Sequence, residues 1–263
     1  MPAPAVTPSE TTAILTAHPP RRTLPAWARR FVAPVAVAVV LLATLGWISV
    51  LELDSIEQRT LNADYIAARI GEHLVLSILA SILVAVIAIP AGIAVSRSHS
   101  RVFRGAIVGL ANIGQATPAI GVVILLAIMW QTGFTTALIA LVIYAFLPVL
   151  QNTITGLAQV DPNIRESARG MGMTPGQVLR QVELPLASPV ILAGLRTALV
   201  FAVGVATVAT FINAGGLGDM IINGLKLQRY PVLVVGAVLV ACIAVLIDWV
   251  AGVVEELLRP KGL

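Results

Sequence analysis

The chain has 263 residues, of which 58% are hydrophobic and only 11% are charged. A soluble domain of this size carries about 25% charged residues, so the composition excludes an ordinary soluble protein and favours an integral membrane protein. The single cysteine, Cys242, excludes an internal disulfide, and the three histidines are too scattered to suggest a metal site. The net charge of +4 comes from basic residues spread over short loops, a pattern that favours membrane orientation over nucleic-acid binding.

The first thirty residues are rich in Pro, Thr and Ala and have no sustained hydrophobic period, so we expect a disordered tail over 1–30. This tail is too long and too often interrupted by proline to be a standard secretory leader. Four arginines precede the first apolar stretch, which therefore resembles a retained signal anchor: Arg21, Arg22, Arg29 and Arg30. An additional first transmembrane helix and an external loop are expected over 31–69.

Six apolar stretches are long enough, or nearly so, to cross a hydrocarbon core of roughly 30 Å as helices. The predicted fold class is therefore an all-α, polytopic membrane helical bundle with about six transmembrane helices. The expected spans are 31–51, 73–95, 106–130, 134–155, 189–212 and 231–254.

The basic residues of the loops predict the orientation of these spans. With the N-terminus in the cytoplasm, twelve basic residues lie inside: Arg21, Arg22, Arg29, Arg30, Arg97, Arg101, Arg104, Arg165, Arg169, Arg180, Arg259 and Lys261. Four lie outside: Arg59, Arg69, Lys226 and Arg229. Short loops rich in Lys and Arg stay in the cytoplasm, so we expect both termini there, including a short tail over 256–263.

The longest polar interruption in the second half of the chain lies at 161–190, which this orientation places in the cytoplasm. Asp161 followed by Pro162 is a typical helix start and predicts a short helix over 162–169. Thr174 and Gln177 have the spacing of a capping box and predict a second helix that ends near Glu183.

Two proline pairs then predict a break before the next span. Leu184-Pro185 is expected to end the second helix of the hairpin, and Ser188-Pro189 to begin the following transmembrane helix. The small residues Ala168 and Gly172 would permit close approach of a partner. An apolar face is expected from Ile164, Met171, Met173, Val178, Leu179 and Val182. From the pattern alone, a hairpin lying at the lipid interface explains these features equally well.

The hairpin 161–185 resembles a known family signature. It contains Glu166-Ser167-Ala168, then Gly172, then Val182-Glu183-Leu184-Pro185, with three and nine residues between the blocks. This spacing resembles the EAA motif of ABC importer permeases, with Ser167 in place of Ala and Val182 in place of Ile. The resemblance implies that Glu166, Ser167, Ala168, Gly172, Val182, Leu184 and Pro185 contact a cytoplasmic ATPase subunit.

Further stretches narrow the resemblance to permeases for osmoprotectants such as glycine betaine and choline. They are "GQATPAIGVVILL" at 114–126, "LPVLQNTITGL" at 147–157 and "NAGGLGDMIINGL" at 213–225. The similarity covers about 70–255 and implies a core like that of type I ABC importer permeases, located in a bacterial inner membrane. "GGLGD" is shared with some methionine permeases, so methionine or another small solute remains an alternative cargo.

The sequence contains no G-x-x-x-x-G-K-[ST] motif, so we expect no ATP binding and no enzymatic activity in this chain. The resemblance implies that ATP and Mg²⁺ bind a separate ATPase subunit, and that this chain itself carries no cofactor and no metal. The implied partners are cytoplasmic ATP-binding subunits, a second permease subunit (identical or related), an external substrate-binding protein and membrane lipid. Nucleic acid is not expected.

Polar residues and prolines inside the spans suggest a translocation path. Gln115, Thr117, Pro118 and Asn152 are the candidate path residues, because interrupted helices in membranes line protein or a cavity rather than lipid. Polar contacts between helices are the alternative explanation. Arg196 and Asp248 are the ionisable residues deepest in their spans and lie at matching depth, which predicts a structural ion pair. Contact with substrate is the alternative for either.

Only 5% of the residues are aromatic, and Trp130, Phe134, Tyr144 and Phe146 do not form an evident cage for a quaternary ammonium group. High-affinity recognition is therefore expected in the external binding protein. The Gly-rich segment 213–230 is expected near the outer gate or docking surface, or else as a connecting loop. Two other classes remain open: an ion-driven secondary carrier, which should show paired broken helices, and a membrane scaffold that transports nothing.

Overall fold

The computed structural model describes residues 26–258, with side chains over 31–257. Every regular element in this range is helical, which confirms the predicted all-α class. The long helices are α2 (Ala26–Ser49), α4 (Ala63–Arg97), α7 (Phe134–Ala158), α10 (Leu184–Ala206) and α12 (Tyr230–Leu258). The predicted tail lies outside the described residues except for 26–30, as do residues 259–263 of the C-terminal tail.

Five helices of the described range are long and apolar enough to span a membrane, and a sixth crossing requires that a bent pair count as one span. That pair is α5 (Arg101–Ala116) and α6 (Ala119–Met129), which meet at 101°. The expected stretch 106–130 is therefore a bent pair of helices, with the break at Pro118, one of the residues from which an interrupted helix was expected. Pro118 lacks an N–H group and holds the preceding Thr117 in an extended conformation (φ −74°, ψ 136°), which ends α5.

The junction between the hairpin and the next span also differs from the prediction. The helix continues without a break from α9 (Pro175–Val178) through a π-helical turn, η1 (Leu179–Glu183), into α10, so neither Pro185 nor Pro189 interrupts it. The π turn shifts the backbone hydrogen-bond ladder just before Pro185, which accommodates a ring that has no N–H group. Ser188 does not cap a new helix, because its hydroxyl donates to the carbonyl of Pro185 at 2.8 Å.

The centre of the bundle is formed by α4, α7 and α10, which approach closely at small residues. A Cβ atom at Gly92 of α4 would lie 2.6 Å from Cβ of Thr153, and one at Gly194 of α10 would lie 2.5 Å from Cβ of Asn152. Helices in a membrane gain little from the hydrophobic effect between themselves, so such close van der Waals contact provides much of their attraction.

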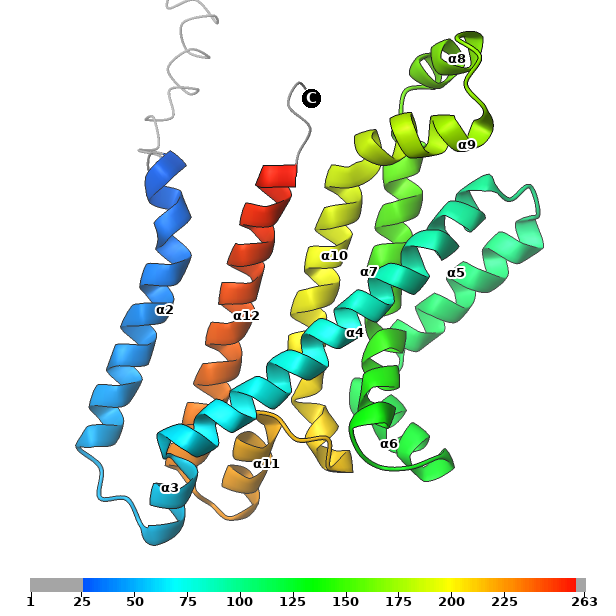
Figure 1. The fold of residues 1–263 in the computed structure, drawn as a ribbon. Coiled ribbons are helices and arrows are strands. Elements are labelled where there is room, and N and C mark those ends of the chain that lie inside the picture. The colour runs from blue at the N-terminus through cyan, green and yellow to red at the C-terminus, as the bar shows by residue number, and fades with distance from the viewer. Residues whose placement is uncertain (1–25, 259–263) are drawn as a thin grey trace, which may run out of the picture.

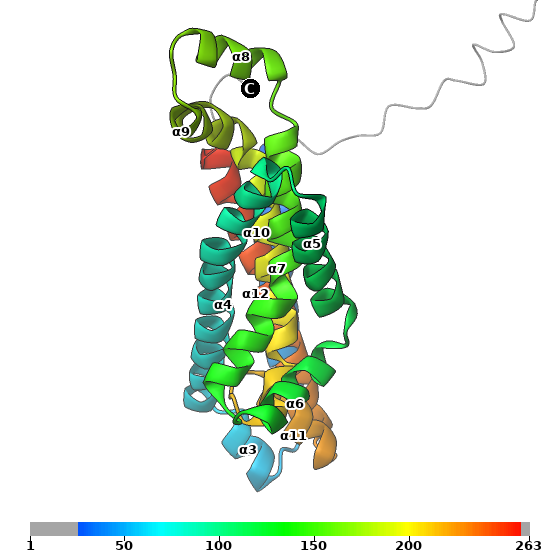
Figure 2. The same cartoon turned by 90° about the vertical axis from the view of Figure 1, so that its right-hand side faces the viewer.

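The remaining elements lie at the two ends of the bundle. The start of α2, the end of α12 and the hairpin formed by α8 (Pro162–Gly170) and α9 lie at one end (Figure 1). At the other end lie α3 (Ser55–Thr60), α6, the 3-10 helix η2 (Val208–Ile212) and α11 (Gly218–Lys226) (Figure 2). Helix α2 stands at the edge of the bundle beside α12, and few of its side chains are buried.

Candidate functional site

The polar hairpin is built from helices with well-formed N-termini. Asp161 accepts the N–H of Asn163 at 2.8 Å, and Pro162 occupies the first position of α8. At the start of α9, Thr174 accepts the N–H of Gln177 at 3.4 Å, and the Gln177 side chain accepts the N–H of Thr174 at 2.8 Å. Both predicted caps are confirmed. They make the hairpin a firm projection rather than a flexible loop.

Gly172 allows the sharp turn between the two helices. Its φ of +86° lies in the left-handed region, and a Cβ atom there would meet nothing within 4 Å. The N–H groups of Gly172 and Met173 donate to the carbonyls of Arg169 and Ala168 at 2.9 and 3.2 Å. Glycine is therefore required here for its backbone conformation, and the open space leaves the turn accessible to a partner.

The apolar residues of the hairpin do not form one continuous face. Val178 is 1% exposed and packs into this chain, whereas Met171 at the turn is 76% exposed and Ile164 is 44% exposed. Ala168 is 2% exposed, so its small side chain serves packing within the hairpin. The free apolar surface is thus located on α8 and the turn, where Glu166 and Ser167 are also exposed. Val182 and Leu184 are half-buried, and Pro185 is exposed.

Glu183 connects the hairpin to a second membrane helix. Its side chain is 3% exposed and forms an ion pair with Arg97, the last residue of α4. Its second oxygen, Oε1, has no hydrogen-bond partner among the described residues. The sequence analysis missed this residue, because the motif leaves the position between Val182 and Leu184 unspecified. The signal that could have identified Glu183 is an acidic residue at the start of an apolar span.

The candidate path residues do not converge. Gln115, Thr117 and Pro118 lie at the break between α5 and α6; Gln115 and Thr117 are partly exposed and Pro118 is exposed. Asn152 lies on α7, where its amide donates to the carbonyl of Pro148 at 2.8 Å and its side chain contacts Gly194. Gly114 of α5 lies against Ile143 of α7. Ile143 precedes Asn152 by nine residues, so the two are separated by about 13 Å along the helix. Asn152 thus has the geometry of a contact between helices.

Arg196 and Asp248 lie together between α10 and α12. Arg196 Nε and a terminal nitrogen donate to the two carboxylate oxygens of Asp248 at 2.5 and 2.6 Å, and Glu255 lies 3.8 Å from the same guanidinium. A Cβ atom at Gly252 would be 3.1 Å from Arg196, so the glycine leaves room for the guanidinium. Bidentate geometry of this kind orients a charged pair within apolar surroundings.

The Gly-rich segment at the opposite end is packed, not an open loop. Gly215 and Gly216 have φ of +79° and +89°, and the N–H of Gly216 donates to Glu72 at 2.8 Å. A Cβ atom at Gly218 would collide with the carbonyl oxygen of Thr207. Asp219 pairs with Arg69 of α4 at 2.8 Å. The segment therefore connects α10, α4 and α11 at this end of the bundle.

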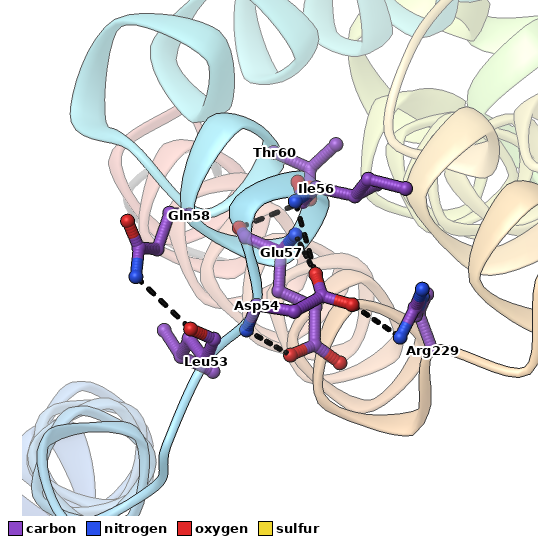
Figure 3. A network of polar contacts seen from close by, with 7 residues as sticks. All are labelled: Leu53, Asp54, Ile56, Glu57, Gln58, Thr60 and Arg229. Atoms are coloured by element: carbon purple, nitrogen blue, oxygen red, sulfur yellow. Dashed lines mark hydrogen bonds and ion pairs between the residues drawn. The ribbon is translucent and has the colours of Figure 1, made fainter.

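A polar network connects α3 to the start of α12 (Figure 3). Asp54 accepts the N–H groups of Ile56 and Glu57 at 2.9 and 2.8 Å, and its other oxygen pairs with Arg229. The pKa of the Asp54 carboxyl lies below its ordinary value, mainly because the Glu57 backbone N–H donates to it, with Ile56 and Arg229 acting in the same direction. Helix α3 was not predicted, although Asp54 and Glu57 have capping-box spacing.

These features define a class: a polytopic helical membrane protein with a capped hairpin projecting from one end. Solved transporters share this fold. Inward-facing MetNI, a methionine ABC transporter, matches with a TM-score of 0.67 and 21% identity over 74% of this chain and 96% of that one. An amino acid ABC transporter crystallised with histidines matches with a TM-score of 0.65 and 18% identity over 78% and 99%.

Residues 88–260 match the family described as the binding-protein-dependent transport system inner membrane component, and the chain belongs to this family. It is 40% identical over 202 residues to the glycine betaine/carnitine/choline transport system permease protein OpuCB of Bacillus subtilis (strain 168), covering 77% of this chain and 92% of the relative. It is 42% identical over 192 residues to the choline transport system permease protein OpuBB of the same organism, covering 73% and 88%. The family resemblance seen in the motifs is thereby confirmed, and the chain is a transport subunit rather than an enzyme.

Proposed function

We propose that this chain is the membrane-spanning permease of an ATP-driven importer for small osmoprotectants, with glycine betaine and choline as the first candidates for cargo. One observation carries the proposal: a capped hairpin with the EAA-type spacing continues without a break into α10 and pairs with α4 through Glu183 and Arg97. A hairpin attached in this way transmits a push to two membrane helices. The named substrates of the relatives support the choice of cargo.

Methionine is a weaker alternative. It is suggested by the GGLGD sequence, but Gly215, Gly216 and Gly218 are each accounted for by backbone conformation or by close packing. These glycines therefore reflect the fold and carry no information about the transported solute.

The proposed setting is a bacterial inner membrane with both termini and the hairpin in the cytoplasm. The basic residues support this orientation, since Arg97, Arg101, Arg104, Arg165, Arg169 and Arg180 belong to the hairpin and to the α4–α5 turn. Two cytoplasmic ATPase subunits bind ATP and Mg²⁺, a second permease completes the path, and an external binding protein delivers the cargo to the end that carries α11.

In the proposed cycle, ATP closes the ATPase dimer and moves the hairpins of the two permeases together. Each hairpin acts on α10 directly and on α4 through the Arg97–Glu183 pair, which opens the path outward, and hydrolysis resets it. Gln115, Thr117 and Pro118 belong to the path at the broken α5–α6 pair, whereas Asn152 is assigned to helix packing. Arg196 and Asp248 form a structural ion pair that holds α10 against α12.

Uptake by proteoliposomes tests the proposal. The permease is reconstituted with its ATPase and binding protein, and entry of radiolabelled glycine betaine, choline and methionine is measured with ATP, without ATP, and without the ATPase. Uptake that requires both ATP and the ATPase is expected. Uptake by the permease alone under an ion gradient would identify a secondary carrier, and no uptake under any condition would favour a scaffold.

Site-specific crosslinking tests the role of the hairpin. Met171→Cys in a Cys242→Ser background places a single thiol on the exposed turn, and Gln58→Cys places one on exposed α3 at the opposite end. A crosslink to the ATPase is expected from position 171 and not from position 58. Equal labelling from both positions, or none from position 171 in a complex that transports, would contradict the assignment.

A further inference from the structure

A pocket of about 340 Å³ lies between the hairpin and the ends of the membrane helices, and the cycle proposed above uses only the Arg97–Glu183 pair of its wall. Its charged walls come from four elements: Arg97 of α4, Arg104 of α5, Arg165 of α8 and Glu183 of η1. Its apolar side is formed by Ile154 and Leu157 of α7. The pocket therefore joins the α4–α5 turn to the first helix of the hairpin.

The pocket carries excess positive charge. Arg97 and Glu183 form an ion pair and neutralise each other. Arg104 and Arg165 have no acidic partner and no side-chain hydrogen bond within the described residues. Two guanidinium groups in one pocket repel each other and favour a shared anion, and phosphate suits their planar arrangement of donors.

The positions of these arginines in their helices point the same way. Arg104 is the fourth residue of α5 and Arg165 the fourth of α8, and neither helix has an acidic residue in its first turn. The N-terminal end of a helix dipole is positive, so cations near it are unfavourable unless an anion is bound nearby. Arg104 therefore has a local cost that an anion in the pocket would offset, whereas at α8 the carboxylate of the N-cap Asp161 already lies at the helix end.

Two further features describe the anion. Oε1 of Glu183 has no hydrogen-bond partner among residues 26–258 and is enclosed by protein, so it can accept a ligand hydroxyl only after its neighbours shift. The side chains of Ile154 and Leu157 offer a surface for carbon atoms next to the phosphate. A phosphate ester with a free hydroxyl, such as a glycerol phosphate, has a group for each part of the pocket. Its phosphate suits the guanidinium groups, its hydroxyl the carboxylate, and its carbon atoms the apolar side.

We propose that this pocket binds the phosphate of a glycerol phosphate headgroup, as in phosphatidylglycerol. The placement of the pocket at the cytoplasmic leaflet rests on the orientation given under the proposed function. Basic pockets between helix ends on that side of a membrane bind anionic headgroups. Because Arg104 and Arg165 belong to different elements, an occupied pocket holds α8 against the α4–α5 turn.

Native mass spectrometry of the full-length permease in detergent tests the proposal by titration with phosphatidylglycerol and, separately, phosphatidylcholine. Arg104→Gln and Arg165→Gln remove the two unpaired charges. The matched controls Arg101→Gln and Arg169→Gln remove the same charges from the same helices outside the pocket. We expect affinity for phosphatidylglycerol to fall about fivefold for each pocket arginine and about 25-fold for the pair, with little change in the controls.

Two further arms make the result decisive. Arg104→Lys and Arg165→Lys keep the charge but not the planar guanidinium, so each should bind more tightly than the matching Gln variant, which separates loss of the site from loss of the fold. Soluble glycerol phosphate, added in excess, should not displace the lipid if the acyl chains contribute to binding, whereas full displacement assigns the pocket to a soluble phosphate ester. Equal binding of both lipids, or equal losses in the pocket and control variants, would overturn the site. Because the titration needs no ATPase, its result is independent of the uptake assay.

Discussion

Gly172 and Gly218 show two separate reasons for glycine in this chain. At Gly172 the surroundings are open and the backbone is left-handed, whereas at Gly218 the backbone is ordinary and the carbonyl of Thr207 occupies the place of a side chain. The left-handed backbone of Gly172 affects only the turn of the hairpin, whereas the close contact at Gly218 affects how two segments of the chain pack. Substitutions at the two positions therefore act on different parts of the molecule.

Gly172→Ala is expected to destabilise the turn of the hairpin by about 1 kcal/mol, because a Cβ atom is unfavourable at φ of +86°. Gly170→Ala is the matched control, since Gly170 lies at the end of α8 with open space and no positive φ. Hydrogen exchange of the amides of residues 171–178 measures the difference. Equal exchange in the two variants would show that the left-handed turn does not limit the stability of the hairpin.

The Asp54 carboxyl predicts a local dependence on pH. Because its pKa in the folded protein is below the ordinary value of 3.8, its ionised form stabilises α3 at pH values above 3.8, and this stabilisation is lost as the pH falls through the folded pKa. Exchange at the amides of Ile56 and Glu57, corrected for intrinsic rates, should therefore rise below pH 3.8. Asp54→Asn keeps a capping side chain but cannot titrate, so this rise should disappear. A rise that persists in Asp54→Asn would assign the pH dependence to another group.

At the scale of elements, the connections between helices matter more than the helices themselves. The second helix of the hairpin, α9, belongs to the same continuous helix as α10, and the Arg97–Glu183 pair also joins it to α4. The two partners differ in environment, because the Arg97 side chain is 37% exposed and that of Glu183 is 3% exposed. Loss of either partner should therefore have unequal consequences.

Arg97→Met is expected to lower the free energy of unfolding by about 3 kcal/mol, because it leaves a buried carboxylate without a partner. Glu183→Gln should cost less, since the exposed Arg97 regains water. The double variant Arg97→Met/Glu183→Met should recover much of the loss, because it leaves no unpaired charge. Thermal unfolding in detergent ranks the three. A double variant as unstable as Arg97→Met alone would mean that packing, not charge, dominates this joint.

At the scale of the whole molecule, α2 and α3 are attached to the edge of the bundle. Helix α2 packs beside α12, and α3 is held by the pair between Asp54 and Arg229 (Figure 3). The family match begins at residue 88, well after these elements. The central packing of α4, α7 and α10 does not involve them.

A chain shortened to residues 62–263 is therefore expected to insert, to keep the orientation of the hairpin and to support uptake at half the full-length rate or more. The loops that we propose to be cytoplasmic retain their arginines, which favour the same orientation. Accessibility of Met171→Cys to a membrane-impermeant reagent reports the side of the hairpin, and uptake reports function. An inverted or unfolded product would show that α2 is needed to direct insertion.

Most of the structural features that could be predicted depend on residues that lie close together in the sequence. The membrane class, the approximate spans and both hairpin caps follow from apolar length and from residues within four positions of one another, and the signature spacing lies within the single segment 166–185. Pro118 and Pro185 show the limit of such reasoning. Each lies where a helix is expected to break, but α5 ends before Pro118, whereas a π turn carries the helix past Pro185.

The sequence by itself determined a helical membrane protein with a capped hairpin, because the free energy of placing apolar residues in lipid and of capping helix ends is largely local. The matching depth of Arg196 and Asp248 also predicted their pair, but the tertiary structure alone decided which of the other charges meet. Arg97 reaches Glu183 across 86 residues, and Arg69 reaches Asp219 across 150. Such pairs depend on how helices cross, and the crossings are determined by close contacts at Gly92, Gly156 and Gly194 that no local pattern specifies.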